Sequence, residues 1–132
     1  MDGQDSGCGF DDPENPQSMD SLLSALGGDV RDWSGKVECC GASLALTKRN
    51  IVINLVEDLV KMARDVKADA MVAACPLCNM NVDGRQKLSS DAMPVFYFTE
   101  LLGLAMGLPG TSKWWGKHII PPKKLLKSHN LI

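Results

Sequence analysis

Residues 70–78 read AMVAACPLC, and this stretch indicates the fold because a short apolar run leads directly into a pair of cysteines. A run of this length, over 70–74, is typical of a strand buried on both faces of a parallel sheet. We expect a helix over 79–88 with Cys78 in its first turn, where the backbone amide dipoles favour a thiolate. The cysteines Cys75 and Cys78 are therefore expected where a strand ends and a helix begins.

A second pair of cysteines, Cys39-Cys40, precedes the first, and thirty-four residues separate Cys40 from Cys75. We expect an extended segment over 36–39 to lead into this pair, and Gly41 to let the backbone turn sharply after it. Thr47 is the expected N-cap of the longest helix. The apolar residues of that helix repeat at helical spacing and predict one core-facing stripe, formed by Ile51, Leu55, Val56, Leu59, Met62, Ala63 and Val66.

Two further patterns lie on either side of the region that contains the cysteine pairs. Asn15 is the expected N-cap of an earlier helix that begins at Pro16 and ends at Gly27-Gly28. Residues 94–98 predict a third strand, and Thr99 is the expected cap of a following helix over 101–108.

The alternation of strands and helices predicts an α/β fold with a small, mostly parallel sheet flanked by helices. The site is expected at the carboxyl ends of the strands, where open sheets gather ligands. We expect residues 1–9 to be a disordered or truncated N-terminus, and residues 10–132 to form a single domain with a tail from about residue 111.

Composition narrows the class of protein. The chain has 132 residues, 45% of them hydrophobic and 23% charged, and a net charge of −2. These values are ordinary for a soluble globular domain, and there is no basic footprint for nucleic acid and no run long enough for a membrane span. The acidic N-terminus lacks the features of a secretory signal, so we expect a cytoplasmic protein with reduced thiols.

Three chemistries can use the paired thiols. Tetrahedral zinc suits Cys75 and Cys78, but neighbouring side chains such as Cys39 and Cys40 point to opposite sides of extended backbone and close poorly on one ion. An iron–sulfur cluster spreads its ligand positions over several irons and favours a vicinal pair. Thiol–disulfide exchange by a thioredoxin-like protein suits the order strand, CxxC, helix, with Met93-Pro94 before a later strand, but leaves Cys39-Cys40 unexplained. Buried, unreactive thiols are the fourth interpretation.

Several motifs are spread over the chain from Phe10 onward. They are Asp11-Asp12-Pro13-Glu14-Asn15-Pro16, Trp33-Ser34-Gly35-Lys36, Glu38-Cys39-Cys40-Gly41-Ala42-Ser43-Leu44, Ala74-Cys75-Pro76-Leu77-Cys78 with Asn81, and Tyr97-Phe98-Thr99-Glu100-Leu101-Leu102. In these motifs the chain resembles the cysteine-rich CCG domain, and in particular the C-terminal CCG domain found in the B-type subunits of heterodisulfide reductase.

This resemblance implies a noncubane [4Fe-4S] cluster that reduces a disulfide in one-electron steps. Carried over, Cys39, Cys40, Cys75 and Cys78 match cluster ligands. The family also has a cysteine well ahead of the vicinal pair; Cys8 is the candidate, although only thirty residues separate it from Cys39 and the strand that would present it is missing. The implied partners are a ferredoxin-like iron–sulfur subunit and a flavin subunit, and the implied substrate is a disulfide. This chain would be a fragment of such an oxidoreductase subunit.

Other residues have two interpretations each. His118 is a candidate proton donor to a leaving thiolate, or a hydrogen-bonded surface histidine; His129 is expected to be inert. Trp114-Trp115 forms either a docking patch or packing under the tail. Asn79 and Asn81 bond to cluster sulfurs or cap a helix, and the Lys123-Lys124-Lys127 run is a solvated face. The competing function is a non-catalytic module that holds zinc or a structural cluster and docks a partner.

Overall fold

The computed structural model describes residues 10–87 and 89–132. Five helices and two strands follow one another along the described chain, with three short 3-10 turns between them. The elements are α1 (Ser18–Ala25), η1 (Ala42–Leu44), α2 (Arg49–Asp65), β1 (Met71–Ala73), α3 (Pro76–Arg85), β2 (Val95–Tyr97), α4 (Phe98–Ala105), η2 (Thr111–Lys113), η3 (Trp115–Lys117) and α5 (Lys123–Ser128). No described helix is both long and apolar enough to cross a membrane.

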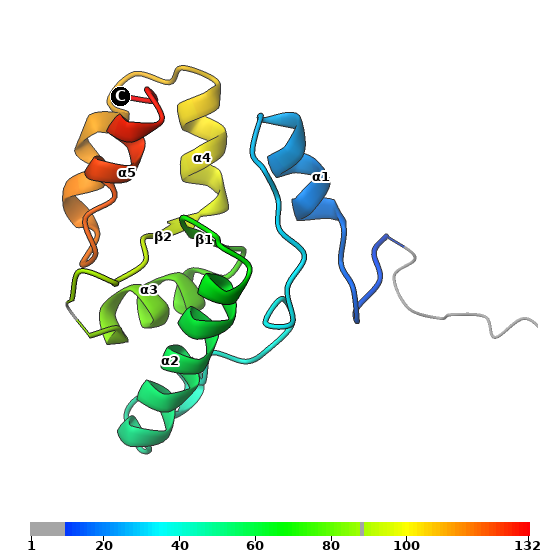
Figure 1. The fold of residues 1–132 in the computed structure, drawn as a ribbon, viewed down its shortest axis with the longest axis vertical. Helices are drawn as coiled ribbons and strands as arrows, with labels where there is room; N and C mark the ends of the chain where they lie inside the picture. Colours follow the sequence, from blue (N-terminus) through cyan, green and yellow to red (C-terminus); the bar gives the residue numbers. More distant parts are fainter. Residues whose placement is uncertain (1–9, 88) are drawn as a thin grey trace, which may run out of the picture.

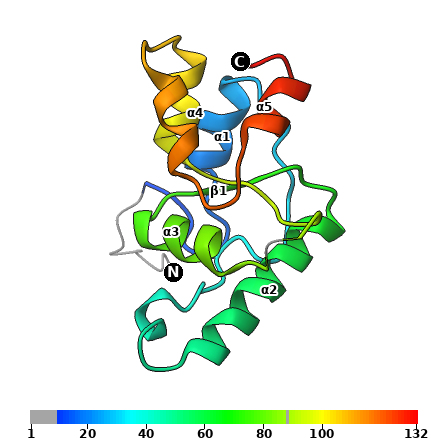
Figure 2. The same cartoon turned by 90° about the vertical axis from the view of Figure 1, so that its left-hand side faces the viewer.

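The two strands are parallel and pair in the register Met71 to Val95, Val72 to Phe96 and Ala73 to Tyr97. They lie between two groups of helices: α2 and α3 on one side, and α1, α4 and α5 on the other (Figures 1 and 2). This arrangement confirms an α/β fold with a small parallel sheet flanked by helices. The extended segment predicted over 36–39 is wrong in its first half, because residues 36–37 belong to a turn and only 38–39 are irregular backbone outside it.

Strand β2 separates two hydrophobic cores. Adjacent residues of a strand point to opposite faces, and here Val95 packs into one core while Phe96 packs into the other. The first core is built mainly by α2, whose fully buried residues include Val52 and Val56. The second core contains Trp115 and Leu126, so the C-terminal residues pack against the domain.

The buried face of α2 differs by one position from the predicted stripe. Val52 and Val60 are buried, whereas Ile51 is 50% exposed. The helix begins at Arg49 without a side-chain cap, so Thr47 is not its N-cap. Adjacent residues point in directions about 100° apart around a helix. Val52 faces the first core, and Ile51 beside it therefore faces away from it.

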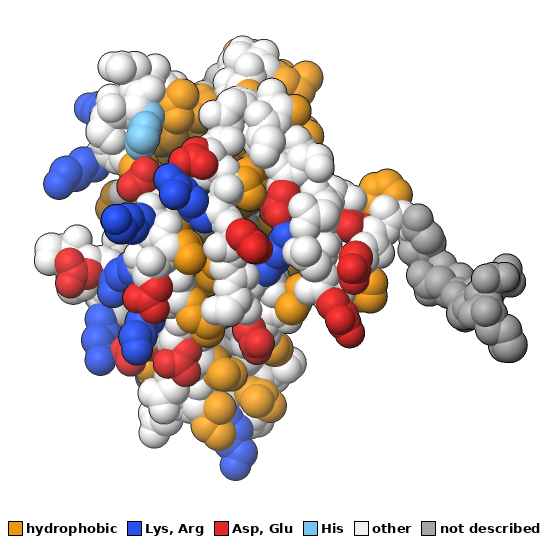
Figure 3. All heavy atoms as spheres, turned by 45° about the vertical axis from the view of Figure 1, so that its right-hand side comes forward, with side chains coloured by type: hydrophobic (Ala, Val, Ile, Leu, Met, Phe, Trp, Pro, Cys, Tyr) orange, Lys and Arg blue, Asp and Glu red, His pale blue; other side chains and the backbone are white. Residues whose placement is uncertain are grey.

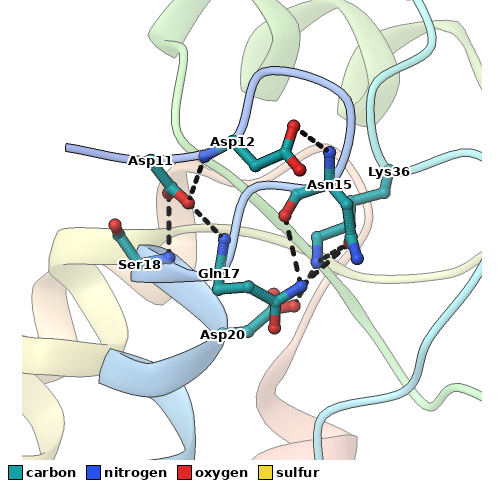
Figure 4. A network of polar contacts seen from close by, with 7 residues as sticks. All are labelled: Asp11, Asp12, Asn15, Gln17, Ser18, Asp20 and Lys36. Carbon is teal, nitrogen blue, oxygen red and sulfur yellow. Dashed lines mark hydrogen bonds and ion pairs between the residues drawn. The ribbon is translucent and has the colours of Figure 1, made fainter. Parts of the chain in front are cut away.

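Asp11 anchors the first helix in place of Asn15 (Figure 4). Its carboxylate accepts hydrogen bonds from the amides of Gln17 and Ser18, at 2.8 and 2.9 Å. These bonds lower the pKa of Asp11 from 3.8 to about 2. The Asn15 side chain instead accepts a hydrogen bond from Lys36, which also forms an ion pair with Asp20 of α1. The network therefore ties α1 to the turn that precedes Cys39.

Gln86 substitutes for a neighbouring strand beside the start of β2. Its side-chain amide donates to the carbonyl of Met93 and accepts from the Met93 N–H, both at 2.8 Å. Pro94, the next residue, offers its carbonyl to Met71 of β1 at 3.0 Å. The backbone ahead of β2 is thus bonded on both sides, to β1 on one and to a side chain on the other.

Candidate metal centre

The paired cysteines reach the site from two different local structures. Cys75 is the N-cap residue of α3 and Cys78 lies in the first turn of that helix, as the sequence predicts. Cys39 and Cys40 end an irregular segment, and Gly41 follows with a φ of 76°. A positive φ is readily adopted by glycine, and this turn directs the chain away from the thiols into η1.

The four thiols divide into a close pair, of which Cys40 is buried and Cys78 partly buried, and an exposed pair. The Sγ atoms of Cys40 and Cys78 are 3.2 Å apart, and Cys40 is only 3% exposed. Cys39 and Cys75 are exposed, and the Sγ atom of Cys39 accepts a hydrogen bond from the amide of Gly41 at 3.3 Å. The fold therefore joins one thiol from each motif and leaves the other two open to solvent.

The thiols of the CxxC motif differ in acidity. The backbone amides of Cys78 and Leu77 lower the pKa of Cys75, although neither forms a capping hydrogen bond of good geometry with its side chain. Burial raises the pKa of Cys78 to about 12, and the neighbouring thiols of Cys40 and Cys75 add to the rise. The thiol that would ionise first is therefore the exposed one.

Asn81 holds the Cys39-Cys40 segment from α3. Its side-chain amide donates to the carbonyl of Cys40 at 2.9 Å, and its oxygen accepts from Nε of Arg85 at 3.1 Å. Asn81 thus neither caps the helix nor bonds to a sulfur in this structure. Asn79 has a buried side-chain oxygen without a hydrogen-bond partner among the described residues. This role of Arg85 was not predicted from the sequence, although residues four apart on a helix are neighbours and the spacing from Asn81 indicates a contact.

The four candidate donors are all thiols, which is the ligand type that iron–sulfur clusters take. In the described part of the chain, no three Cys, His, Asp or Glu side chains lie close enough together to hold a single metal. Cys40 meets Cys78, whereas its neighbour Cys39 is exposed. Tetrahedral zinc needs four convergent ligands, while iron–sulfur clusters take thiolates at separate irons. The four thiols therefore match iron–sulfur clusters in the type of ligand atom that they offer. Cys8 lies outside the described residues.

His118 is buried in the second core, not on the surface. Its side chain is 4% exposed and pairs with Glu100 at 3.0 Å, with Phe96 and Trp115 against its ring. Its hydrogen-bond partner is therefore a carboxylate of α4 and not a thiol. His129 lies in the tail and faces Asp69 at 3.5 Å, with both side chains largely exposed.

The tryptophan pair belongs mainly to the core. Trp115 is 2% exposed and packs edge-on against Phe96, which rules it out as an exposed docking patch. Trp114 is half-buried against Gly103 of α4. The expected alternative, packing under the tail, is the arrangement in the structure. Lys123, Lys124 and Lys127 are exposed, as predicted.

Asp83 holds the tail, a role that no sequence pattern indicates. It is a buried carboxylate on α3 that accepts hydrogen bonds from the amides of Ile119 at 2.7 Å and Ile120 at 3.0 Å. The partners are backbone groups more than thirty residues away, so no local spacing reveals them. One helix thus contacts both the cysteine segment and the tail.

Comparison with known proteins agrees with this arrangement. Residues 5–83 match the CCG cysteine-rich domain. An 8-methylmenaquinol:fumarate reductase membrane anchor subunit from Wolinella succinogenes is 28% identical over 123 residues, 89% of this chain and 43% of the relative. The B-type subunit of a ferredoxin:CoB-CoM heterodisulfide reductase from Methanosarcina mazei is 31% identical over 104 residues, 73% of this chain and 35% of the relative.

A third relative, from Archaeoglobus profundus, is named as similar to the B-type subunit of heterodisulfide reductase. It is 27% identical over 125 residues, which are 89% of this chain and 42% of the relative. The chain therefore spans between 35% and 43% of the length of these three relatives. The matched family region contains both cysteine pairs and the whole of the Asn81 contact with Cys40. By its sequence match over more than half of its length, this chain belongs to the CCG family of cysteine-rich domains.

Proposed function

We propose that this chain is an iron–sulfur module of a heterodisulfide reductase-like oxidoreductase, with Cys39, Cys40, Cys75 and Cys78 as ligands of a noncubane [4Fe-4S] cluster. The observation that carries the proposal is the approach of Cys40 and Cys78 to 3.2 Å, which joins the two motifs into one all-thiol site. When bound, such a cluster supplies single electrons for cleavage of a disulfide. The names of the relatives support this class of reaction.

The residues of the chain have separate roles in this proposal. The turn at Gly41 and the N-terminus of α3 present the four thiols from two sides. Cys39 and Cys75 are exposed, so the site is accessible to a disulfide and to an electron donor. His118 is a weaker candidate as proton donor, because its side chain is buried against Glu100.

Cys8 is the candidate fifth ligand. It falls inside the region matched by the family, which begins three residues before it. The test is a Cys8→Ser variant: loss of iron relative to wild type supports a ligand role, and unchanged iron content removes Cys8 from the ligand set.

The proposed partners are a ferredoxin-like iron–sulfur subunit and a flavin subunit, and the proposed substrate is a disulfide. The ferredoxin named in one relative and the heterodisulfide named in two support the iron–sulfur electron donor and the disulfide substrate, whereas the flavin subunit rests on the family resemblance alone. We place the chain in the cytoplasm, whereas another relative is named a membrane anchor subunit. Cell fractionation followed by immunodetection distinguishes a cytoplasmic from a membrane-associated protein.

A second candidate function is dithiol exchange by the CxxC motif alone. It is favoured by the exposed Cys75 at the start of a helix that follows a strand, with a lowered pKa. This function needs Cys75 and Cys78 but leaves Cys39 and Cys40 without a role.

Metal analysis of anaerobically purified full chain tests the main proposal. Iron and sulfide in near-equal amounts with a broad visible absorption band are expected. Stoichiometric zinc without a visible band would support the structural zinc module instead. A metal-free protein that reduces insulin disulfides, and loses this activity on Cys75→Ser but not on Cys39→Ser, would support dithiol exchange.

A further inference from the structure

Three residues on one face of α3 contact the segment 40–45, which follows Cys39. Cys78, Asn81 and Arg85 are spaced by three and four residues, which aligns them along a helix. The Cys78 thiol lies 3.2 Å from the Cys40 thiol, the Asn81 amide bonds to the Cys40 carbonyl, and the Arg85 guanidinium donates to the carbonyl of Ala45 at 3.3 Å. These three residues of α3 therefore contact both ends of the segment 40–45.

The contact of Asn81 is buried and has a defined orientation. Asn81 is 5% exposed, so a donor left without its acceptor here would be costly. Arg85 offers only N–H groups, which requires the Asn81 oxygen to face it and the Asn81 NH₂ to face Cys40. A flipped amide would place oxygen against the Cys40 carbonyl and NH₂ against the guanidinium. Arg85 thus fixes which way the Asn81 amide points.

We propose that Asn81, oriented by Arg85, is a positioning residue that sets the distance between the Cys40 and Cys78 thiols. The Cys40 carbonyl that it bonds is attached to the same Cα as the Cys40 side chain, and Asn81 itself lies about one helical turn from Cys78. The inference rests on the proposed function only where it concerns the cluster. The thiol geometry can be tested without any metal.

The first experiment measures how readily Cys40 and Cys78 form a disulfide. The full chain carries Cys8→Ser, Cys39→Ser and Cys75→Ser, and is equilibrated in a glutathione redox buffer. Two thiols and one oxidised glutathione give one protein disulfide and two reduced glutathiones, so electrons and protons balance. The equilibrium constant reports how closely the fold holds the two sulfur atoms.

Asn81→Asp is the critical variant, because a carboxylate still accepts from Arg85 but cannot donate to Cys40. We expect the equilibrium constant for disulfide formation to fall about tenfold, in line with the loss of an outer partner at a ligand site. Asp83→Asn is the matched control: Asp83 lies on the same helix at 6% exposure, but its bonds go to the tail. We expect the control to change this constant by less than about twofold, because residues two apart on a helix do not face each other and Asp83 makes no bond to the cysteine segment.

An equal fall in Asn81→Asp and Asp83→Asn would overturn the proposal, since both would then act only through general stability. If Asn81→Asp does not fold, Arg85→Gln replaces it, because Arg85 is only partly buried. That variant removes the guanidinium bond to Ala45, and we expect a fall of about threefold to tenfold. No change in Arg85→Gln would also contradict the proposed role.

The second experiment addresses the cluster. After anaerobic reconstitution of the chain with all cysteines intact, we expect Asn81→Asp to retain less iron and to show altered electron paramagnetic resonance, and Asp83→Asn to match the wild type in both. If the wild type itself takes up no iron, the proposed function fails, while the disulfide measurement still decides whether Asn81 positions the thiols.

Discussion

Gly41 sets the direction in which the chain leaves the paired cysteines. Its φ of 76° is costly for other residues, and an added Cβ would lie 2.8 Å from Cδ1 of Leu55. We expect Gly41→Ala to lower the free energy of unfolding by about 2 kcal/mol, since left-handed backbone alone costs roughly 1–2 kcal/mol. Urea denaturation of the metal-free chain measures this change.

Gly84→Ala is the matched control for Gly41→Ala. Gly84 lies inside α3 and an added Cβ would meet nothing within 4 Å. Alanine favours a helix over glycine by about 1 kcal/mol, so this variant is expected to be more stable than the wild type. Two variants with the same sign of change would contradict the conformational explanation.

Asp11 makes the stability of the N-terminal segment dependent on pH. Its pKa is lowered from 3.8 to about 2 by the amides of Gln17 and Ser18, so the folded state binds its proton less readily than the unfolded state. This contribution to stability is complete above pH 3.8 and is lost as the pH falls towards 2. Figure 3 shows several acidic side chains gathered on the surface where the described chain begins.

The corresponding test compares wild type with Asp11→Asn by urea denaturation across this acidic range. We expect the difference in the free energy of unfolding to be largest above pH 3.8 and to shrink steadily towards pH 2. A difference that is constant with pH would show that the Asp11 bonds do not depend on its charge.

At the scale of elements, α3 connects the thiol site to the tail through Asp83. Replacing this carboxylate by an amide in Asp83→Asn turns one acceptor into a donor that faces the amides of Ile119 and Ile120. We expect the free energy of unfolding to fall by about 2 kcal/mol, the cost of an unsatisfied buried group. Amide hydrogen exchange should show reduced protection at Ile119 and Ile120.

Asp91→Asn provides the control on an exposed carboxylate. Asp91 lies outside the helices and strands, and its substitution is expected to change stability by less than about 0.5 kcal/mol. If Asp83→Asn is equally harmless, the tail is held by its apolar contacts alone.

Elements with strong local patterns were predictable, and those that depend on distant partners were not. The apolar repeat located α2 to within a few residues, and the run before Cys75 located β1. Segment 36–39 is not a strand because residues 34–37 form a turn, in which the Glu38 N–H donates to the Gly35 carbonyl at 3.2 Å. The strands themselves are shorter than predicted, since only three residues of each find a partner.

The residues at which the helices start were also difficult to predict, because the groups that bond to these starts lie outside the usual cap position. Asn15, Thr47 and Thr99 have the residue types of caps but do not act as such. In α4 the bond comes from Glu100, which accepts from the Tyr97 amide at 2.9 Å. Asp11 reaches the start of α1 from six residues away. A cap contributed from outside the usual position leaves no local signal. The paired cysteines, in contrast, are local motifs, and the structure brings one thiol of each pair together.

At the scale of the whole molecule, β2 makes the two cores interdependent. Val95 and Phe96 are adjacent and serve opposite cores, so neither core can lose its strand without the other. We expect Val95→Ala to cost on the order of 2 kcal/mol and to shift the unfolding of both cores together. Both proteins compared carry Trp33→Phe, so that their tryptophan fluorescence comes only from Trp114 and Trp115 of the second core.

The measurement follows this fluorescence and the far-ultraviolet circular dichroism during urea denaturation. Coincident midpoints that move together on Val95→Ala are expected of a single cooperative unit. A fluorescence midpoint that stays in place while the circular dichroism midpoint falls would show that the second core unfolds independently.

The pairing of Gln86 with the backbone of Met93 also affects encounters between molecules. A strand edge with free N–H and C=O groups is a template on which another chain can add a strand and begin to aggregate. At Met93 both groups are already bonded to the Gln86 side chain, and Pro94 beside it has no N–H to offer. This part of the sheet edge is therefore closed to strand addition by a single glutamine, without the need for another element of secondary structure.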